Sequence, residues 1–164
     1  MAERTLTIGV GNELRGDDGA GLRVADLLAA RGFDAIRCEG EPIALLDLWE
    51  GADAVFVVDA VAGAHAGRIW RWQPGAAEMP LELRRHASTH LLGLGDVLQL
   101  AERLGRAPRE LTVIGIEGDS FELGSAPSPA VEAAVFSVAA AVVAELSAAP
   151  ARAPASDPIG GVGR

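Results

Sequence analysis

Positive charge and cysteine are both scarce in this chain. Basic residues number 14 against 23 acidic ones, so the formal net charge is −9. An anionic protein is repelled by nucleic-acid backbones and anionic lipid, and neither is expected as its partner. A metal ion, a cation or a protein with a basic patch remains compatible with this charge. The single cysteine, Cys38, excludes an internal disulfide and favours a reducing compartment, the cytoplasm.

Long hydrophobic runs and targeting signals are missing as well. The longest uncharged apolar run covers residues 133–144, well short of the roughly 20 residues that a membrane-spanning helix needs. We therefore expect this run to form a buried helix. The first ten residues contain no secretory signal pattern, so no membrane partner is expected.

The signatures of several enzyme classes are also missing. The chain has no Gly-x-Ser-x-Gly nucleophile elbow and no His-Glu-x-x-His zinc motif. Residues 9–14 lack the third glycine of a dinucleotide-binding fingerprint. Gly11 and Gly16 have the spacing of P-loop glycines, but Asp17 and Asp18 stand where the Lys-Ser/Thr pair belongs. Two carboxylates at this place repel a nucleotide and attract a metal ion or a proton.

Strand and helix patterns alternate along most of the chain, and 49% of its residues are hydrophobic. Residues 1–148 are expected to form a single α/β domain. The tail, residues 149–164, is rich in Ala, Pro and Gly and is expected to be disordered. Strands are expected over residues 6–10, 35–38, 54–59, 68–72 (an edge strand) and 111–116. Helices are expected over residues 19–31, 42–50, 91–104 and 129–148.

This alternation predicts a three-layer α/β sandwich, with a twisted, mostly parallel sheet of about five strands and helices on both faces. Ligands of such sheets bind beyond the carboxyl ends of the strands. Asp17 and Asp18 follow the first strand, and Asp59 closes the most apolar one. The loop with His86 and His90 is expected to return to the same edge, so acidic groups and a histidine can meet there.

The carboxylates have both a functional and a structural interpretation. Asp59 ends the run Val-Phe-Val-Val, so it must be solvated, paired or bound to a metal. One of Asp17 and Asp18 is expected to cap the following helix, which leaves the other for function. Two oxygens and one imidazole nitrogen suit a borderline divalent ion with open positions. The imidazole must be neutral to bind a metal, so the affinity for the metal should weaken as the pH falls through the histidine pKa.

The histidines and the cysteine also have ordinary explanations. His65 lies in a glycine-flanked turn and is expected to be exposed, and His86 follows two arginines and can be a solvated neighbour. His90 follows Ser88-Thr89 at an expected helix start, where it can pack against the helix end. Cys38 ends an expected strand without an evident histidine partner, so it is interpreted as a small core residue.

Three segments resemble the hydrogenase maturation endopeptidases, which process the large subunit of nickel–iron hydrogenases. They are residues 9–21 (GVGNELRGDDGAG), residues 57–60 (VVDA) and residues 88–98 (STHLLGLGDVL), with a further match at residues 128–132. The resemblance covers roughly residues 6–146. It implies that Asp18, Asp59 and His90 bind a metal and carry catalysis, with Asp17 as a cap or orienting residue.

The resemblance also implies the substrate and the metal. The substrate would be the nickel-loaded precursor of a hydrogenase large subunit, from which a short C-terminal peptide is removed. Nickel would be carried by the substrate, no organic cofactor would be needed, and the enzyme would act as a cytoplasmic monomer. A carboxylate, or a water that it activates, would attack the scissile carbonyl.

One segment departs from the family, and two other functions compete. The family often has an Asp-Gly-Gly-Thr-like turn where this chain has residues 39–42 (Glu-Gly-Glu-Pro). We expect this loop to border the cleft and to affect substrate choice. The competing functions are a non-proteolytic nickel-binding chaperone of the same fold and a small-molecule hydrolase that uses the acidic loop.

Overall fold

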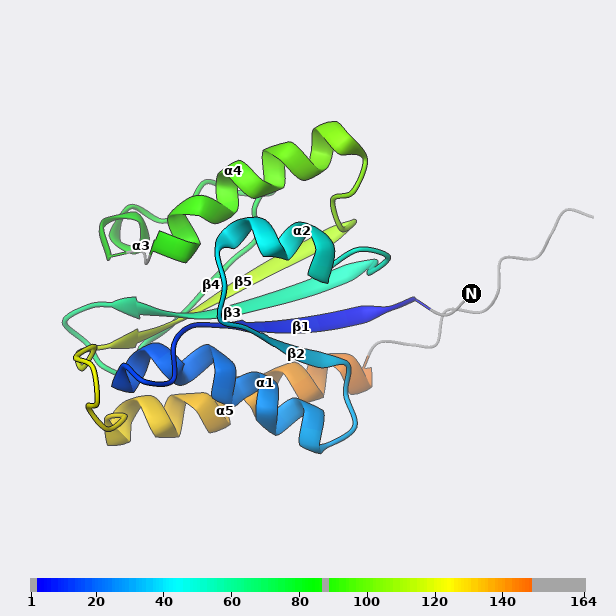
Figure 1. Ribbon diagram of the computed structural model, residues 1–164. Helices are drawn as coiled ribbons and strands as arrows, with labels where there is room; N and C mark the ends of the chain where they lie inside the picture. The colour runs from blue at the N-terminus through cyan, green and yellow to red at the C-terminus, as the bar shows by residue number, and fades with distance from the viewer. Residues whose placement is uncertain (1–2, 87–88, 149–164) are drawn as a thin grey trace, which may run out of the picture.

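A five-stranded sheet forms the centre of the molecule, with helices on both faces (Figure 1). The structure is a computed structural model that describes residues 3–86 and 89–148, without the side chains of residues 85, 86, 89, 90 and 92. The strand order is β2-β1-β3-β5-β4. The strands are β1 (Thr5–Val10), β2 (Ala35–Cys38), β3 (Ala54–Ala62), β4 (Ile69–Trp72) and β5 (Glu110–Gly118). All neighbours pair in parallel except β4, which runs antiparallel to β5 at the edge.

The helices divide between the two faces. In Figure 1, α1 (Ala20–Ala30) and α5 (Pro129–Ala148) lie below the sheet, and α2 (Leu45–Leu48), α3 (Leu81–His86) and α4 (Thr89–Leu104) lie above it. Two short 3-10 turns complete the elements, η1 (Gly16–Gly19) and η2 (Pro42–Ala44). The predicted three-layer α/β sandwich with a mostly parallel sheet is therefore confirmed.

Strand β3 explains why the sheet is buried on both faces. Its alternate residues contribute to two separate cores: Val55, Val57 and Val61 pack under α2 and α4, whereas Phe56 and Val58 pack against α1 and α5. A parallel strand covered by helices on both sides needs this continuous apolar pattern.

Helix α5 is the one helix, in the part of the chain that the structure describes, long and apolar enough to cross a membrane. Six of its side chains are buried against α1 and the sheet: Val131, Ala134, Val135, Val138, Ala139 and Val142. The core helix of a water-soluble domain passes the same test of length and composition. A helix over this region is confirmed, with one face buried and residues such as Phe136 exposed.

Three expectations about the elements are wrong. Asp59 does not close its strand, because β3 continues to Ala62 and pairs with β5 along its whole length. Residues 42–50 are not one helix but the turn η2 followed by the short helix α2. Helix α3 was not expected at all. Its six residues are too few for a periodic pattern, and Leu83 secures it by packing into the core.

Candidate active site at the carboxyl edge of the sheet

Asp59 is a candidate ligand buried inside the sheet. It is 1% exposed, and its Oδ1 accepts a hydrogen bond from the main-chain N–H of Ala60 at 2.8 Å. It lies inside β3 opposite Gly115 of β5. Its flanking neighbours on the same face, Val57 and Val61, belong to the core beneath α4. A carboxylate in these surroundings is costly to bury without strong partners, which marks it as a candidate functional group.

A small cavity lies directly beside Asp59. Its volume is about 10 Å³, room for about one water molecule. The lining is otherwise mainly apolar and comes from β1, β2, the loop after β2, η2, α2, β3 and α4: Val10, Cys38, Gly40, Pro42, Leu45, Val57, Leu91 and Leu94. Gly40 and Pro42 belong to the segment that departs from the family pattern. The expectation that this segment borders the site is therefore confirmed.

The loop after β1 brings Asp18 to the same edge. Gly11 begins this loop with φ +150°, and a Cβ there would lie 1.9 Å from the carbonyl oxygen of Asp18. Only glycine allows the loop to fold back on itself this closely. The turn η1, which contains Asp18, contacts β3. Asp18 is half-buried, so Asp18 and Asp59 come from neighbouring elements at one edge.

Asp17 does not point into this site. It is completely buried, and its Oδ2 accepts hydrogen bonds from the N–H groups of Asp119 and Ser120, both at 3.0 Å, and from the Ser128 hydroxyl at 3.1 Å. Its Oδ1 accepts the Ser128 N–H at 2.7 Å. Burial raises the pKa of Asp17, but these hydrogen bonds outweigh burial and hold the pKa below its ordinary value.

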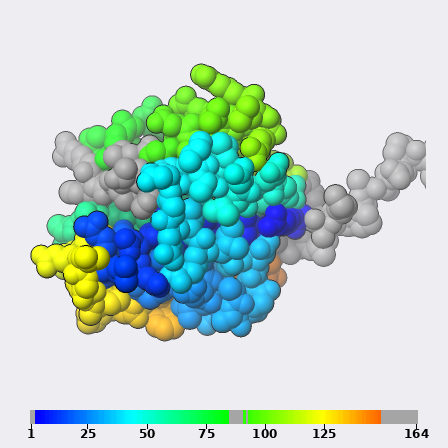
Figure 2. All heavy atoms as spheres, in the orientation of Figure 1, coloured from blue at the N-terminus to red at the C-terminus, as the bar shows by residue number. Residues whose placement is uncertain are grey.

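The capping role expected for one of the two aspartates is wrong. Neither η1 nor α1 has a side-chain hydrogen bond at its N-cap, and these N-caps are Arg15 and Gly19. Asp17 instead joins the β1–α1 loop to the start of α5, more than 100 residues away. Figure 2 shows these two loops, blue and yellow, side by side on the surface. The alternative of an orienting residue fits this arrangement.

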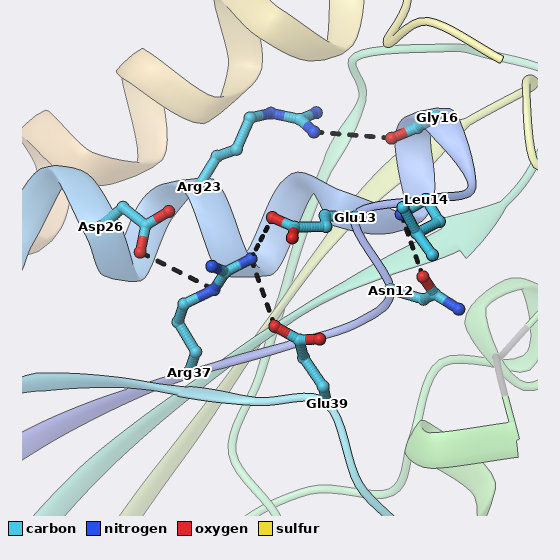
Figure 3. A network of polar contacts seen from close by, with 8 residues as sticks. All are labelled: Asn12, Glu13, Leu14, Gly16, Arg23, Asp26, Arg37 and Glu39. Carbon is cyan, nitrogen blue, oxygen red and sulfur yellow. Dashed lines mark hydrogen bonds and ion pairs between the residues drawn. The ribbon is translucent and has the colours of Figure 1, made fainter. Parts of the chain in front are cut away.

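Arg37 joins the β1–α1 loop to the end of β2 (Figure 3). Its guanidinium lies 2.5 Å from a Glu13 carboxylate oxygen and 3.3 Å from one of Glu39, with Asp26 at 3.8 Å. Asn12 stabilises the same loop by accepting the N–H of Leu14 at 3.0 Å. The acidic groups on this rim are therefore partly neutralised, and the loop that contains Asp18 is fixed from both sides.

Helix α4 brings the third candidate ligand towards the edge. His90 is the second residue of α4, and its side chain lies outside the described part of the structure. Leu91, the next residue, lines the cavity with Asp59. Gly93 allows the close approach of α4 to η2, because a Cβ there would lie 2.9 Å from the Pro42 ring. The start of α4 is thus beside Asp59.

Cys38 lines the cavity beside Asp59, and the two other histidines have different places. The side chain of His86 lies outside the described part of the structure. His65 is exposed in the turn after β3, as expected. Cys38 is a buried core residue, as expected. Burial raises the pKa of the Cys38 thiol; a main-chain hydrogen bond with Gly40 opposes this in part, and the charge of Asp59 makes the smallest contribution and raises the pKa further. Among the described side chains, no three potential ligands are close enough to hold a metal.

The fold is that of a doubly wound α/β domain. Its candidate site lies at the carboxyl ends of the parallel strands, where such domains bind their ligands. The family model for hydrogenase maturation proteases matches residues 40–145. The chain belongs to this family.

Individual relatives match most of this chain. The hydrogenase 2 maturation protease of Escherichia coli K12 is 28% identical, over 87% of this chain and 90% of its own. The hydrogenase expression/formation protein HupD of Rhodobacter capsulatus is 30% identical, over 89% of this chain and 72% of its own. The structure of the hydrogenase maturating endopeptidase HybD from E. coli superposes with a TM-score of 0.71 and 27% identity, over 88% of this chain and 92% of that one.

Proposed function

We propose that this endopeptidase removes a C-terminal peptide from the nickel-loaded precursor of a nickel–iron hydrogenase large subunit, and that Asp18, Asp59 and His90 bind the nickel that the precursor carries. The observation that carries the proposal is the position of Asp59. It is a buried carboxylate beside a cavity at the carboxyl edge of the sheet, and both the Asp18 turn and the start of α4 approach it.

The reaction follows from the donor set. Two carboxylates and one imidazole leave coordination positions for ligands of the precursor. The nickel, as part of the substrate, fixes the precursor segment against the site. In one route, Asp18 or Asp59 takes a proton from a water whose oxygen attacks the carbonyl carbon of the scissile bond, and this proton passes to the leaving amine as the C–N bond breaks. In the other route, the carboxylate itself attacks, the amine leaves with a proton from water, and the remaining hydroxide hydrolyses the acyl anhydride and frees the carboxylate. In this scheme the protein is an aspartic-type peptidase whose activity depends on a metal in its substrate.

The supporting scaffold explains how such a site is held rigid. Asp17 fixes the loop that contains Asp18 to the start of α5, and Arg37 fixes the same loop to the end of β2. Preorganised ligands lose little entropy when the substrate arrives.

The test compares two forms of one precursor. The protein is incubated with nickel-loaded and nickel-free large-subunit precursor, and each mixture is measured by intact-mass spectrometry. The expected result is loss of a C-terminal peptide from the loaded form alone. Equal cleavage of both forms would contradict the role of nickel. Binding of the loaded precursor without any cleavage would favour the non-proteolytic chaperone.

A further inference from the structure

Glu117 is a buried carboxylate that the site described above does not use. It lies near the end of β5 and is 4% exposed. Its main chain is satisfied, because its N–H donates to the Arg68 carbonyl at 2.8 Å and its carbonyl accepts from the Gly67 N–H at 2.7 Å. Its Oε2, in contrast, is buried without a hydrogen-bond partner among the described residues. A buried carboxylate oxygen in this state is unfavourable unless a partner arrives.

The register of the sheet places Glu117 close to Asp59. Asp59 pairs with Gly115, and Glu117 is two residues further along β5, opposite Val61. Side chains two residues apart on a strand share one face, and the strand spacings put the two Cα atoms about 8 Å apart. An extended peptide covers that distance with two to three residues. A substrate segment that runs from Asp59 towards the end of β5 would therefore reach Glu117.

The surroundings of Glu117 explain why its carboxylate is buried and how it can be reached. A Cβ on Gly63 would lie 2.3 Å from Oε1, so the carboxylate packs directly against the backbone of the turn after β3. The Nδ1 atom of His65 lies 3.9 Å from Oε2, too far for a hydrogen bond. The His65 side chain is 71% exposed. A group from outside the chain would approach the carboxylate from the side of this exposed ring.

Two basic residues are near Glu117 among the described side chains, and His65 approaches its carboxylate at 3.9 Å without a hydrogen bond. Arg68, whose main chain pairs with Glu117, has its guanidinium 4.0 Å from the Trp70 ring centroid and 3.2 Å from a Glu82 carboxylate oxygen. The guanidinium is therefore engaged elsewhere. No described side chain donates a hydrogen bond to Oε2 of Glu117, so a donor from outside the chain can be its partner.

We propose that Glu117 is a specificity residue that binds a positively charged side chain of the precursor, an ammonium or guanidinium group, within two to three residues of the segment at Asp59. This inference rests on the proposed function, because it assumes that the precursor crosses the carboxyl edge. A cation is the partner that a buried, uncompensated carboxylate favours most, and charge-assisted hydrogen bonds are the strongest available to it.

The test uses Glu117→Gln, which keeps the shape of the side chain and removes its charge. Glu122→Gln is the matched control, since Glu122 is an exposed glutamate on the loop that follows β5. Processing of nickel-loaded precursor should show a KM at least tenfold higher for E117Q, with kcat within threefold of the unmodified protein. E122Q should leave both constants unchanged. The melting temperature of E117Q should not fall, because the variant removes an uncompensated charge.

The partner is then found by replacing each Lys, Arg and His near the precursor's C-terminus with Gln. One replacement should raise KM for the unmodified protein and leave KM for E117Q unaltered. Unchanged kinetics of E117Q, a loss of kcat alone, or a lower melting temperature of E117Q would each overturn the inference. Failure of the unmodified protein and of E122Q to process any loaded precursor would refute the proposed function instead.

Discussion

Replacing Asp17 by Asn should destabilise the protein severely although the side chain keeps its shape. Asp17 accepts four hydrogen bonds, three from main-chain N–H groups and one from the Ser128 hydroxyl. An amide has one acceptor oxygen, so its NH₂ group must face at least one N–H donor. Charged hydrogen bonds contribute about 1.5–3 kcal/mol each and neutral ones about 1 kcal/mol. The loss of one bond and of the charge in the others should cost on the order of 3–5 kcal/mol.

The effect of Asp17→Asn should depend on pH in a defined direction. The pKa of Asp17 is lowered from its ordinary value of 3.8. The ionised side chain therefore stabilises the folded state above the unfolded pKa, and this contribution is lost as pH falls through the folded pKa. Urea unfolding at pH 7 should show the full difference between the two proteins, and unfolding at pH 3 should show a smaller one.

A control variant separates this effect from a general change of charge. Asp119→Asn removes an exposed carboxylate on the loop after β5, which Asp17 contacts, and the free energy of unfolding should change by less than about 0.5 kcal/mol. The reasoning fails if Asp17→Asn costs less than about 1 kcal/mol at pH 7, or if the difference between the proteins is the same at both pH values.

Two other predictions concern the loop glycine and the cysteine. Gly11→Ala should lower the free energy of unfolding by more than about 2 kcal/mol, because a Cβ would collide with the Asp18 carbonyl. Gly95→Ala, in α4 with open space around an added Cβ, should instead raise it by up to about 1 kcal/mol; equal effects in urea unfolding would contradict this assignment. Cys38 is buried with a raised thiol pKa, so iodoacetamide at pH 7.5 should label the folded protein at least tenfold more slowly than the urea-unfolded chain. Similar labelling rates, followed by mass spectrometry, would show that the thiol is accessible.

The periodicity of the sequence was sufficient to predict the sheet and the long helices. Strand β2 has the predicted bounds, and α5 begins at Pro129 as its Ser-Pro start indicates. Both features depend on short-range patterns, alternation in one case and a fixed φ at the first helical position in the other. Asp59 was located for the same reason, because an acidic residue in an apolar strand is visible without any tertiary information.

The features that sequence reasoning missed depend on residues far apart in the chain. Asp17 has the position of a helix cap, but its partners are on the loop before α5, and no local pattern reveals them. Ser128 has the pattern of an N-cap, yet its hydroxyl donates to Asp17. Glu117 looks like an ordinary strand end until the turn after β3 is seen to bury it. The one signal available in the sequence was that an acidic residue, Glu117, directly follows the apolar run 111–116.

The most direct test of the central claim is the rate at which the Asp59→Asn variant processes nickel-loaded precursor. Asn keeps the size of Asp59 and an acceptor for the Ala60 N–H, so the melting temperature should not fall. If Asp59 binds the precursor's nickel, the rate should drop at least a thousandfold, an increase of about 4 kcal/mol in the activation barrier. A correctly folded variant with a rate within threefold of the unmodified protein would contradict the account.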